Sequence, residues 1–338
     1  MWQGSEAPTF SPTPIDGGWR GRFRATDDEE AEMSTQVEFH GSAGPGAGRD
    51  PRAELLAQIP VRERRVDIAG VSTALLEGGQ GPPVVLLHGP GEFAVRWMRV
   101  IPHLVGTHRV IAPDLPDHGA SELSDGELDA ARVLRWLEEL IGRTCDSPPV
   151  LVGHLLGGAI AARFASRHGD GVDRLVLVDT FGLKRLRPSP RFALALIRFL
   201  ARPTERSYET FMGQCLADPA EFGRQMGATS DALRDYSLDR ARSPRVKSAM
   251  RVLMKEIGVP AIPPDELARI SVPTTLIWGR HDRANRLRVA EAASARLGWP
   301  LHVIDGAADD PPMEQPVAFA EALRAAISTG TDPRGPRG

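Results

Sequence analysis

The sequence predicts an α/β fold in which a mostly parallel sheet of eight strands is flanked by helices and carries a helical insertion. From residue 61 onward, short apolar runs alternate with segments of helical periodicity, which is typical of a parallel sheet wrapped by helices. The alternation stops between residues 184 and 270, where the apolar stripes have helical spacing. We therefore expect a core at 61–183 and 271–329 and a helical cap at 184–270.

Each element follows from its local pattern. The first two strands form a hairpin around Gly70, and the third is continuously apolar, as buried parallel strands are. The expected strands cover 65–69, 72–77, 84–87, 110–113, 149–153, 174–178, 274–278 and 301–304. The expected helices cover 92–105, 128–141, 159–168, 191–200, 208–216, 244–257, 288–297 and 315–327.

Both ends of the chain are predicted to be disordered tails, at 1–60 and 330–338. Residues 1–60 hold eight glycines and six prolines, with an acidic run at 27–30 and no leucine before Leu55. Such a segment cannot bury enough apolar surface to offset the entropy lost on ordering. A short helix over 50–59, ended by Pro60, is the one element that the pattern allows there, and Met33 is an alternative start.

The composition argues against two classes of binding partner, nucleic acids and membrane surfaces. A net charge of −3 and a pI near 6.3 give no electrostatic case for nucleic acid or a membrane surface. Cys145 and Cys215 have no metal-site or disulfide-framework spacing, and His281 and His302 have no ligand pattern around them. We expect a cytoplasmic protein without metal or cofactor. Its oligomeric state is not encoded in any recognisable pattern.

The run Pro149 to Gly158 is a buried strand that leads straight into a glycine-spaced turn and a small-residue helix. Glycines on both sides of the central residue let strand and helix pass closely at a strained turn that usually presents a nucleophile. Here the central residue is Leu155, which has neither a lone pair nor an acidic proton. The geometry of a nucleophile site is predicted without the nucleophile.

Five motifs occur in a recognisable order. They are His88-Gly89 after a strand, the elbow around Leu155, the helical insertion, Trp278-Gly279 followed by Asp282, and Gly306-Ala307 after the last strand. In this order the chain resembles the α/β-hydrolase family with a cap, in its epoxide-hydrolase and esterase-like branch, from Val61 to Ile327.

The resemblance implies a catalytic triad and an oxyanion hole, transferred here position by position. The acid matches Asp282, but the nucleophile position holds Leu155 and the histidine position holds Asp309, with Asp310 as a spare candidate. One expected oxyanion donor is Pro90, which has no N–H. The substitute donor is expected to be Gly91 or the N-terminus of the following helix, and the Leu156 N–H survives any change of side chain.

Asp282 and Asp309 are the sharpest pair of candidate catalytic residues. In their family positions they lie close, so that one would keep its proton near neutral pH and the pair could do acid–base chemistry. The alternative is that Asp309 faces solvent or caps the turn at Pro311, and that Asp282 binds Arg280 or Arg283. Asp179 has an alternative-acid position in some relatives but is expected to cap locally. The expected pocket residues are Leu155, His154, Leu156, Gly89, Pro90, Gly91, Phe181, Phe192 and Phe199.

Three functions remain open. The first is a non-hydrolytic step, such as cyclisation or carbon–carbon bond formation, on an apolar small molecule in natural-product biosynthesis. The second is capture of a small apolar ligand without turnover. The third is hydrolysis of an epoxide or activated ester by water that an aspartate activates.

Overall fold

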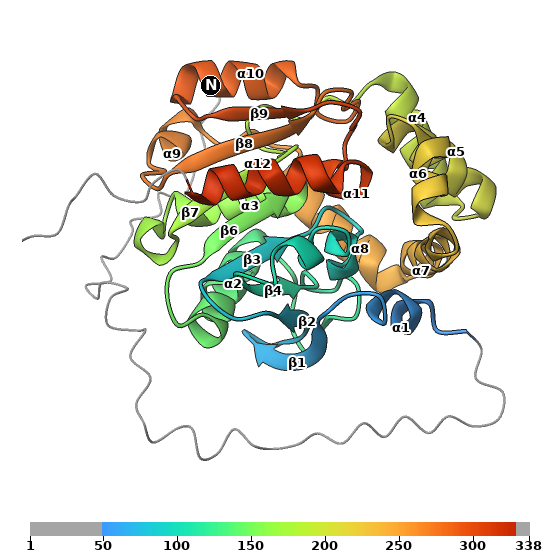
Figure 1. The fold of residues 1–338 in the computed structure, drawn as a ribbon, viewed down its shortest axis with the longest axis horizontal. Coiled ribbons are helices and arrows are strands. Elements are labelled where there is room, and N and C mark those ends of the chain that lie inside the picture. The colour runs from blue at the N-terminus through green and yellow to red at the C-terminus, as the bar shows by residue number, and fades with distance from the viewer. Residues whose placement is uncertain (1–48, 329–338) are drawn as a thin grey trace, which may run out of the picture.

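A central sheet runs through the molecule, with a group of cap helices at one side (Figure 1). The structure is a computed structural model and describes residues 49–328. Its strands are β1 (Arg62–Ile68), β2 (Val71–Gly78), β3 (Pro83–Leu87), β4 (Arg109–Pro113), β5 (Glu122–Leu123), β6 (Val150–His154), β7 (Arg174–Val178), β8 (Thr274–Gly279) and β9 (Leu301–Ile304). Their order in the sheet is β1-β2-β4-β3-β6-β7-β8-β9, and β5 pairs with β2 beside this path.

The predicted α/β fold with a mostly parallel sheet is confirmed. Strands β4, β3, β6, β7, β8 and β9 are parallel, whereas β1 pairs with β2 and β2 with β4 in antiparallel orientation. The prediction of eight strands is wrong by one, since the sheet has nine. Strand β5 has two residues, which is too short to leave a hydrophobic pattern.

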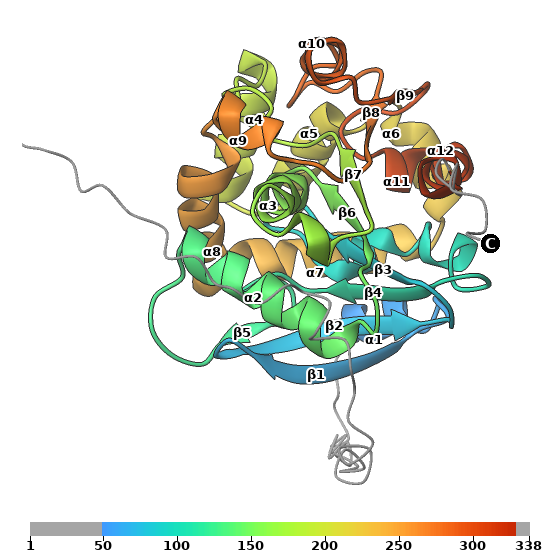
Figure 2. The same ribbon diagram turned by 90° about the vertical axis from the view of Figure 1, so that its left-hand side faces the viewer.

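Strand β3 divides its side chains between two apolar cores. Val84 and Leu86 belong to one core, and Val85 and Leu87 to the other, because successive residues of a strand point to opposite faces. Figure 2 shows α3 and α12 on opposite sides of β6 and β7. The helices that pack on the core of Val85 are α2 (Ala130–Thr144), α3 (Leu156–Ala165) and α10 (Arg288–Leu297), and α12 (Pro316–Ser328) packs on the other.

The helix expected over 92–105 is wrong. The structure has two 3₁₀ turns there, η2 (Ala94–Trp97) and η3 (Ile101–His103). Pro102 lies in the first turn of η3 and has no N–H with which to continue a preceding helix. The loop that carries the strand-end motif is therefore held by short turns.

The insertion consists of α4 (Pro190–Ala201), α5 (Glu205–Cys215), α6 (Pro219–Met226), α7 (Thr229–Arg242), α8 (Pro244–Leu253), a π-helical turn (Met254–Gly258) and α9 (Pro264–Ala268). Sequence patterns predicted α4, α5 and α8 and missed α6 and α7. Side chains of Ser189, Thr204, Asp218 and Ser243 accept backbone N–H groups at the starts of α4, α5, α6 and α8. These caps satisfy N–H groups that the helices leave unpaired.

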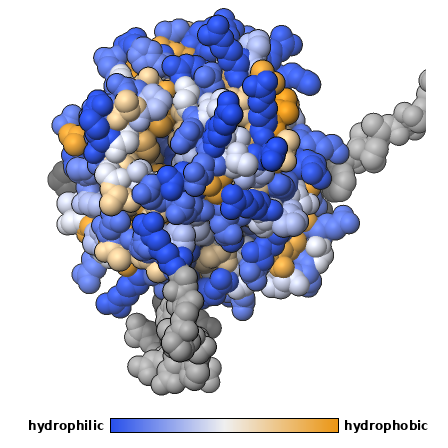
Figure 3. Space-filling model, turned by 90° about the vertical axis from the view of Figure 1, so that its right-hand side faces the viewer, coloured by the Kyte–Doolittle hydropathy of each residue, from blue (hydrophilic) through white to orange (hydrophobic). Residues whose placement is uncertain are grey.

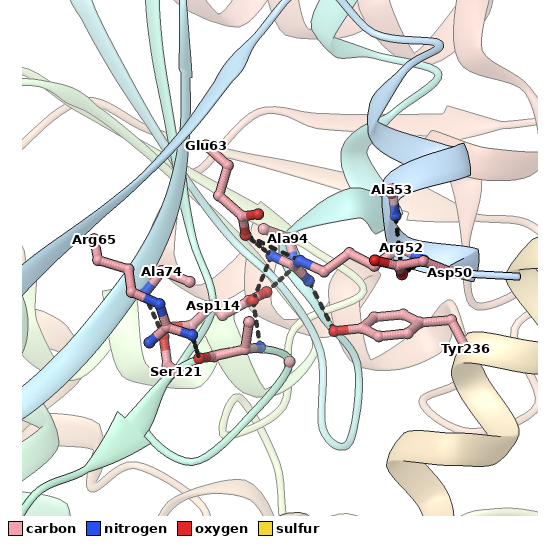
Figure 4. Close-up of polar contacts among 12 residues, drawn as sticks. Asp50, Arg52, Ala53, Glu63, Arg65, Ala74, Ala94, Asp114, Ser121 and Tyr236 are labelled. Carbon is pink, nitrogen blue, oxygen red and sulfur yellow. Dashed lines mark hydrogen bonds and ion pairs between the residues drawn. The ribbon is translucent and has the colours of Figure 1, made fainter. Parts of the chain in front are cut away.

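Helix α1 (Pro51–Leu56) is folded against the domain, so the boundary of the tail expected at residue 60 is corrected for residues 50–60. Arg52 is buried between the core and the cap (Figure 4). Its guanidinium bonds Asp114 at 2.8 Å and the Tyr236 hydroxyl at 2.9 Å, and pairs with Glu63 at 2.5 Å. This network gives α1 the polar anchoring that composition did not reveal.

The remaining tail predictions, for residues 1–48 and 330–338, lie outside the described residues. Within residues 49–328, no helix is both long enough and apolar enough to cross a membrane. In the same range, no cluster of three or more His, Cys, Asp or Glu side chains is arranged to hold a metal ion.

Candidate active site

The turn between β6 and α3 has the strained geometry that the glycine spacing predicts. Leu155 has φ 47° and ψ −106°, a conformation that costs a leucine on the order of 1–3 kcal/mol. A Cβ at Gly153 would lie 2.5 Å from the Gly157 carbonyl oxygen, and one at Gly157 would lie 2.4 Å from the Leu87 carbonyl oxygen. The two glycines are therefore required for the strand and the helix to approach.

Leu155 is fixed by its backbone and faces a cavity. Its N–H donates to the Val178 carbonyl at 3.0 Å, and its own carbonyl accepts the Phe181 N–H at 3.1 Å. Its side chain is buried and contributes to the cavity wall. A hydrocarbon thus occupies the place from which a nucleophile would attack.

The oxyanion side of this turn is occupied by a carboxylate that the sequence reasoning missed. Gly89 donates its N–H to Glu92 Oε2 at 2.8 Å, and Pro90 has no N–H to offer. A Cβ at Gly89 would touch both Glu92 Oε2 at 2.7 Å and Leu155 Cδ1 at 3.1 Å, so the carboxylate and the elbow leucine are neighbours. Glu92 stands three residues after Gly89, the spacing at which a glutamate reaches back to a turn N–H.

Glu92 is held as a negative charge. Burial alone would raise its pKa, but the contact with the His154 ring and the nearby Arg96 charge outweigh burial and lower the pKa to about 2. The distances are 3.6 Å from Glu92 Oε2 to His154 Nδ1 and 3.7 Å from Glu92 Oε1 to Arg96 Nε. A negative charge at this position disfavours an oxyanion beside it.

Asp309 occupies the position where the resemblance implies a histidine. Its carbonyl oxygen accepts a hydrogen bond from His154 Nε2 at 2.7 Å, and its N–H donates to the Cys215 carbonyl at 3.1 Å. Asp309 is buried and is one of the residues that line the cavity, so the alternative in which it faces solvent is wrong. Burial, followed by the charges of Asp282 and Glu314, raises its pKa well above the usual value. The buried Asp309 carboxyl therefore holds its proton more readily than an exposed aspartic acid does.

Asp282 is buried and is not among the residues that line this cavity. Its Oδ1 accepts the backbone N–H groups of Ala284 at 2.6 Å and Asn285 at 2.8 Å, so the alternative in which it binds an arginine is wrong. Burial raises its pKa to about 7. The structure thus places the two predicted carboxyl groups within electrostatic reach of each other.

Asp179 is a third member of this carboxyl cluster. It is fully buried, has φ 43°, and its Oδ1 accepts the Gly279 N–H at 3.0 Å. Burial and then the charge of Asp282 raise its pKa well above the usual value. Neither Asp179 Oδ2 nor Asp282 Oδ2 has a hydrogen-bond donor among the described residues. A single proton shared by these two carboxyl groups would give both oxygens a hydrogen-bond partner and reduce the repulsion between their charges.

Two further candidates are excluded from acid or nucleophile roles. Asp310, the spare candidate, forms an ion pair with Arg96, which keeps that carboxylate occupied. Cys215 also lines the cavity, but burial and then the neighbouring Asp309 charge raise the pKa of its thiol well above the usual value. It is therefore not a ready thiolate nucleophile.

The cavity has a volume of about 490 Å³ and lies between the elbow and the cap helices. Of the predicted pocket residues, Leu155, Pro90, Gly91, Phe181, Phe192 and Phe199 line it. His154, Leu156 and Gly89 do not, because His154 points toward Trp97, Leu156 packs in the core and the Gly89 N–H is taken by Glu92. Other apolar lining residues include Phe93, Leu186, Leu196, Leu200, Phe211, Met212, Met250 and Met254, and the charged ones are Glu92, Arg96, Lys247, Arg251, Asp309 and Asp310.

Comparisons with known proteins agree with this geometry. Residues 84–322 match the alpha/beta hydrolase family. The 2-hydroxy-6-oxo-6-(2'-aminophenyl)hexa-2,4-dienoic acid hydrolase of Metapseudomonas resinovorans is 28% identical over 233 residues, 65% of this chain and 75% of that protein. The pimeloyl-[acyl-carrier protein] methyl ester esterase of Chromobacterium violaceum is 32% identical over 215 residues, 60% of this chain and 77% of the relative.

Solved structures give the same fold. The 2-hydroxy-6-oxo-6-phenylhexa-2,4-dienoate hydrolase of Rhodococcus sp. strain RHA1 superposes with a TM-score of 0.69 at 24% identity, covering 79% of this chain and 98% of that chain. The sequence motifs, the elbow and the family match therefore lead to one conclusion. The chain belongs to the α/β-hydrolase family.

Proposed function

We propose that this protein is an enzyme that performs acid–base chemistry on an apolar small molecule, without a covalent enzyme intermediate. The observation that carries the proposal is a buried Asp309, with a pKa raised well above the usual value by burial, among the residues that line a largely apolar cavity. An acid with a raised pKa in a dry site can give a proton to a substrate oxygen or alkene carbon and recover one from the product. The net reaction is then an isomerisation, cyclisation or carbon–carbon bond formation that consumes no water.

Two features support a non-hydrolytic step over hydrolysis. Leu155 removes the acyl-enzyme route, and the Glu92 carboxylate disfavours the oxyanion of a tetrahedral intermediate. A water-activating base would have to be ionised, whereas the pKa of Asp309 is raised well above its usual value. Holding the reacting atoms together in a shaped cavity supplies the remaining rate acceleration. Natural-product biosynthesis is the setting we propose for such a step.

The proposal is tested with the molecule that fills the cavity. Protein purified from its own host is extracted, and the bound compound is compared by mass spectrometry between wild type and Asp309→Asn. We expect Asp309→Asn to retain an unreacted compound that wild type converts to an isomer on addition. Asp305→Asn, an exposed aspartate of the same region that pairs with Arg280, is the matched control and should behave as wild type.

A second candidate is non-catalytic ligand capture, favoured by the same apolar wall and by the hydrocarbon at the elbow. Under this alternative, wild type and Asp309→Asn hold the same unchanged compound with similar affinity. That result would replace the enzymatic proposal with a binding function.

A further inference from the structure

The segment that opens the cap is strongly basic. No acidic residue occurs between Asp179 and Glu205, whereas six basic residues do: Lys184, Arg185, Arg187, Arg191, Arg198 and Arg202. All six are exposed. Within residues 49–328, no ion pair or hydrogen bond holds any of their side chains. The net charge of −3 for the whole chain averages this local excess away.

Helix α4, in the middle of this segment, has an exposed apolar stripe. Leu194 is 48% and Ile197 62% exposed, and the described residues contain one other exposed large hydrophobic side chain. Arg191 and Arg198 lie on the same stripe, because residues three and four apart share one face of a helix. The outer face of α4 therefore combines apolar side chains with flanking cations.

The inner face of the same helix belongs to the cavity. Phe192, Leu196, Phe199 and Leu200 line it, and Leu186 lines it from the preceding loop. Figure 3 views the side of the molecule that carries the cap helices, where hydrophobic residues are set among hydrophilic ones. One helix thus separates an apolar cavity from an exposed surface that is both apolar and cationic.

We propose that residues 184–202 form a docking surface for an anionic lipid bilayer. Leu194 and Ile197 enter the boundary between headgroups and acyl chains, and the six cations lie over lipid phosphates. Large apolar side chains beside basic ones are what a membrane-surface helix requires. Each Lys or Arg near an anionic surface contributes about a five-fold gain in partitioning. Acidic residues more than about 10 Å from this surface are screened from it by salt.

The proposal is independent of the chemistry assigned to Asp309, since lipid binding is measured without any substrate. It replaces the expectation, drawn from net charge alone, that the protein has no membrane partner.

The test is co-sedimentation of the full chain with vesicles. One set contains phosphatidylcholine with one-third phosphatidylglycerol, and the other contains phosphatidylcholine alone. We expect binding to the anionic vesicles only, and release at high salt. Absence of binding to anionic vesicles at low salt overturns the proposal.

Variants locate the surface. Leu194→Ser with Ile197→Ser, and separately Arg191→Gln with Arg198→Gln, should each weaken binding at least ten-fold. All four side chains are exposed, and circular dichroism checks that the fold is retained. The matched controls are Val317→Ser, which is 58% exposed on α12, and Arg296→Gln with Arg324→Gln, which remove two exposed charges elsewhere. Equal losses in the controls overturn the assignment of this surface.

Other occupants give distinct results. If the arginine pair matters and the Leu194 and Ile197 pair does not, the surface suits an acidic macromolecule and the lipid proposal is overturned. If the full chain binds vesicles only after residues 27–30 are changed to Asn and Gln, the acidic run of this chain is the occupant instead, and the proposal fails for the wild-type protein.

Discussion

The Glu92 carboxylate accepts the Gly89 backbone N–H at 2.8 Å, beside the side chain of Leu155. This one contact uses the strand-end donor next to Pro90 and places a negative charge at the cavity wall. Under the proposed function, the leucine at the elbow and the carboxylate beside it both disfavour acyl transfer. The backbone geometry of the elbow is retained.

Glu92→Gln should destabilise the protein by about 1–3 kcal/mol at pH 7. The amide oxygen can still accept the Gly89 N–H, but Arg96 loses one of the two carboxylates beside it and keeps Asp310. Urea unfolding measures the change in free energy. Glu221→Gln, which breaks the exposed pair with Arg224, is the control and should change stability by less than about 0.5 kcal/mol. Equal effects of the two variants would show that the charge of Glu92 does not stabilise the folded protein.

Restoring a serine should not restore a hydrolase. Neither wild type nor Leu155→Ser should react with a fluorophosphonate probe, because no histidine base follows β9 and Glu92 opposes the oxyanion. Labelling is read by intact-protein mass spectrometry, with an active serine hydrolase as the positive control. Stoichiometric labelling of wild type would disprove the loss of nucleophilic chemistry.

Gly157→Ala should cost several kcal/mol or prevent folding. The new Cβ would lie 2.4 Å from the Leu87 carbonyl oxygen, and a backbone atom in β3 cannot yield. Gly142→Ala is the matched control, because Gly142 lies in α2 with nothing within 4 Å of an added Cβ. It should gain up to about 1 kcal/mol from helix propensity. Denaturant midpoints of the two variants check this contrast.

The free energy of unfolding of Asp282→Asn, relative to that of wild type, should increase as the pH rises. The folded pKa of Asp282 is about 7 and its usual value is 3.8, so the folded state binds more protons between these values. The stabilisation that protonated Asp282 contributes is fully present below pH 3.8 and is lost as the pH rises through the folded-state pKa of about 7. Relative to wild type, the variant should gain stability between pH 5 and 8, as unfolding free energies will show. A pH-independent difference contradicts the protonated cluster.

The fold and the elbow were predictable because their signals are local. The apolar run of β6, Gly153 and Gly157 all lie within a few residues, and steric crowding at Leu155 follows from their spacing. Asp282 and Asp309 were found from motif positions. Asp179 was set aside because its coupling to Asp282 arises only when β7 and β8 are neighbours in the sheet.

Other features depend on contacts between residues that are far apart in the sequence. Helix α7 was missed because charged residues interrupt its apolar stripe, yet Leu233 and Tyr236 are buried. The basic segment after β7 was visible in the sequence, but its significance depends on which side of α4 faces the cavity. The orientation of α4 depends on tertiary packing, which the net charge does not reveal.

Arg52 has a thermodynamic consequence. A single guanidinium joins α1, the loop after β4 and cap helix α7, through Asp114 and Tyr236. If the cap opened alone, Arg52 would lose the Tyr236 hydroxyl, and the apolar contacts that join Leu55 to the core of Leu233 would be exposed to water, which is costly. Cap and core should therefore melt together, as one cooperative transition in which fluorescence, circular dichroism and calorimetric enthalpy agree. The cap and the core are therefore distinct parts of the fold that share one unfolding transition.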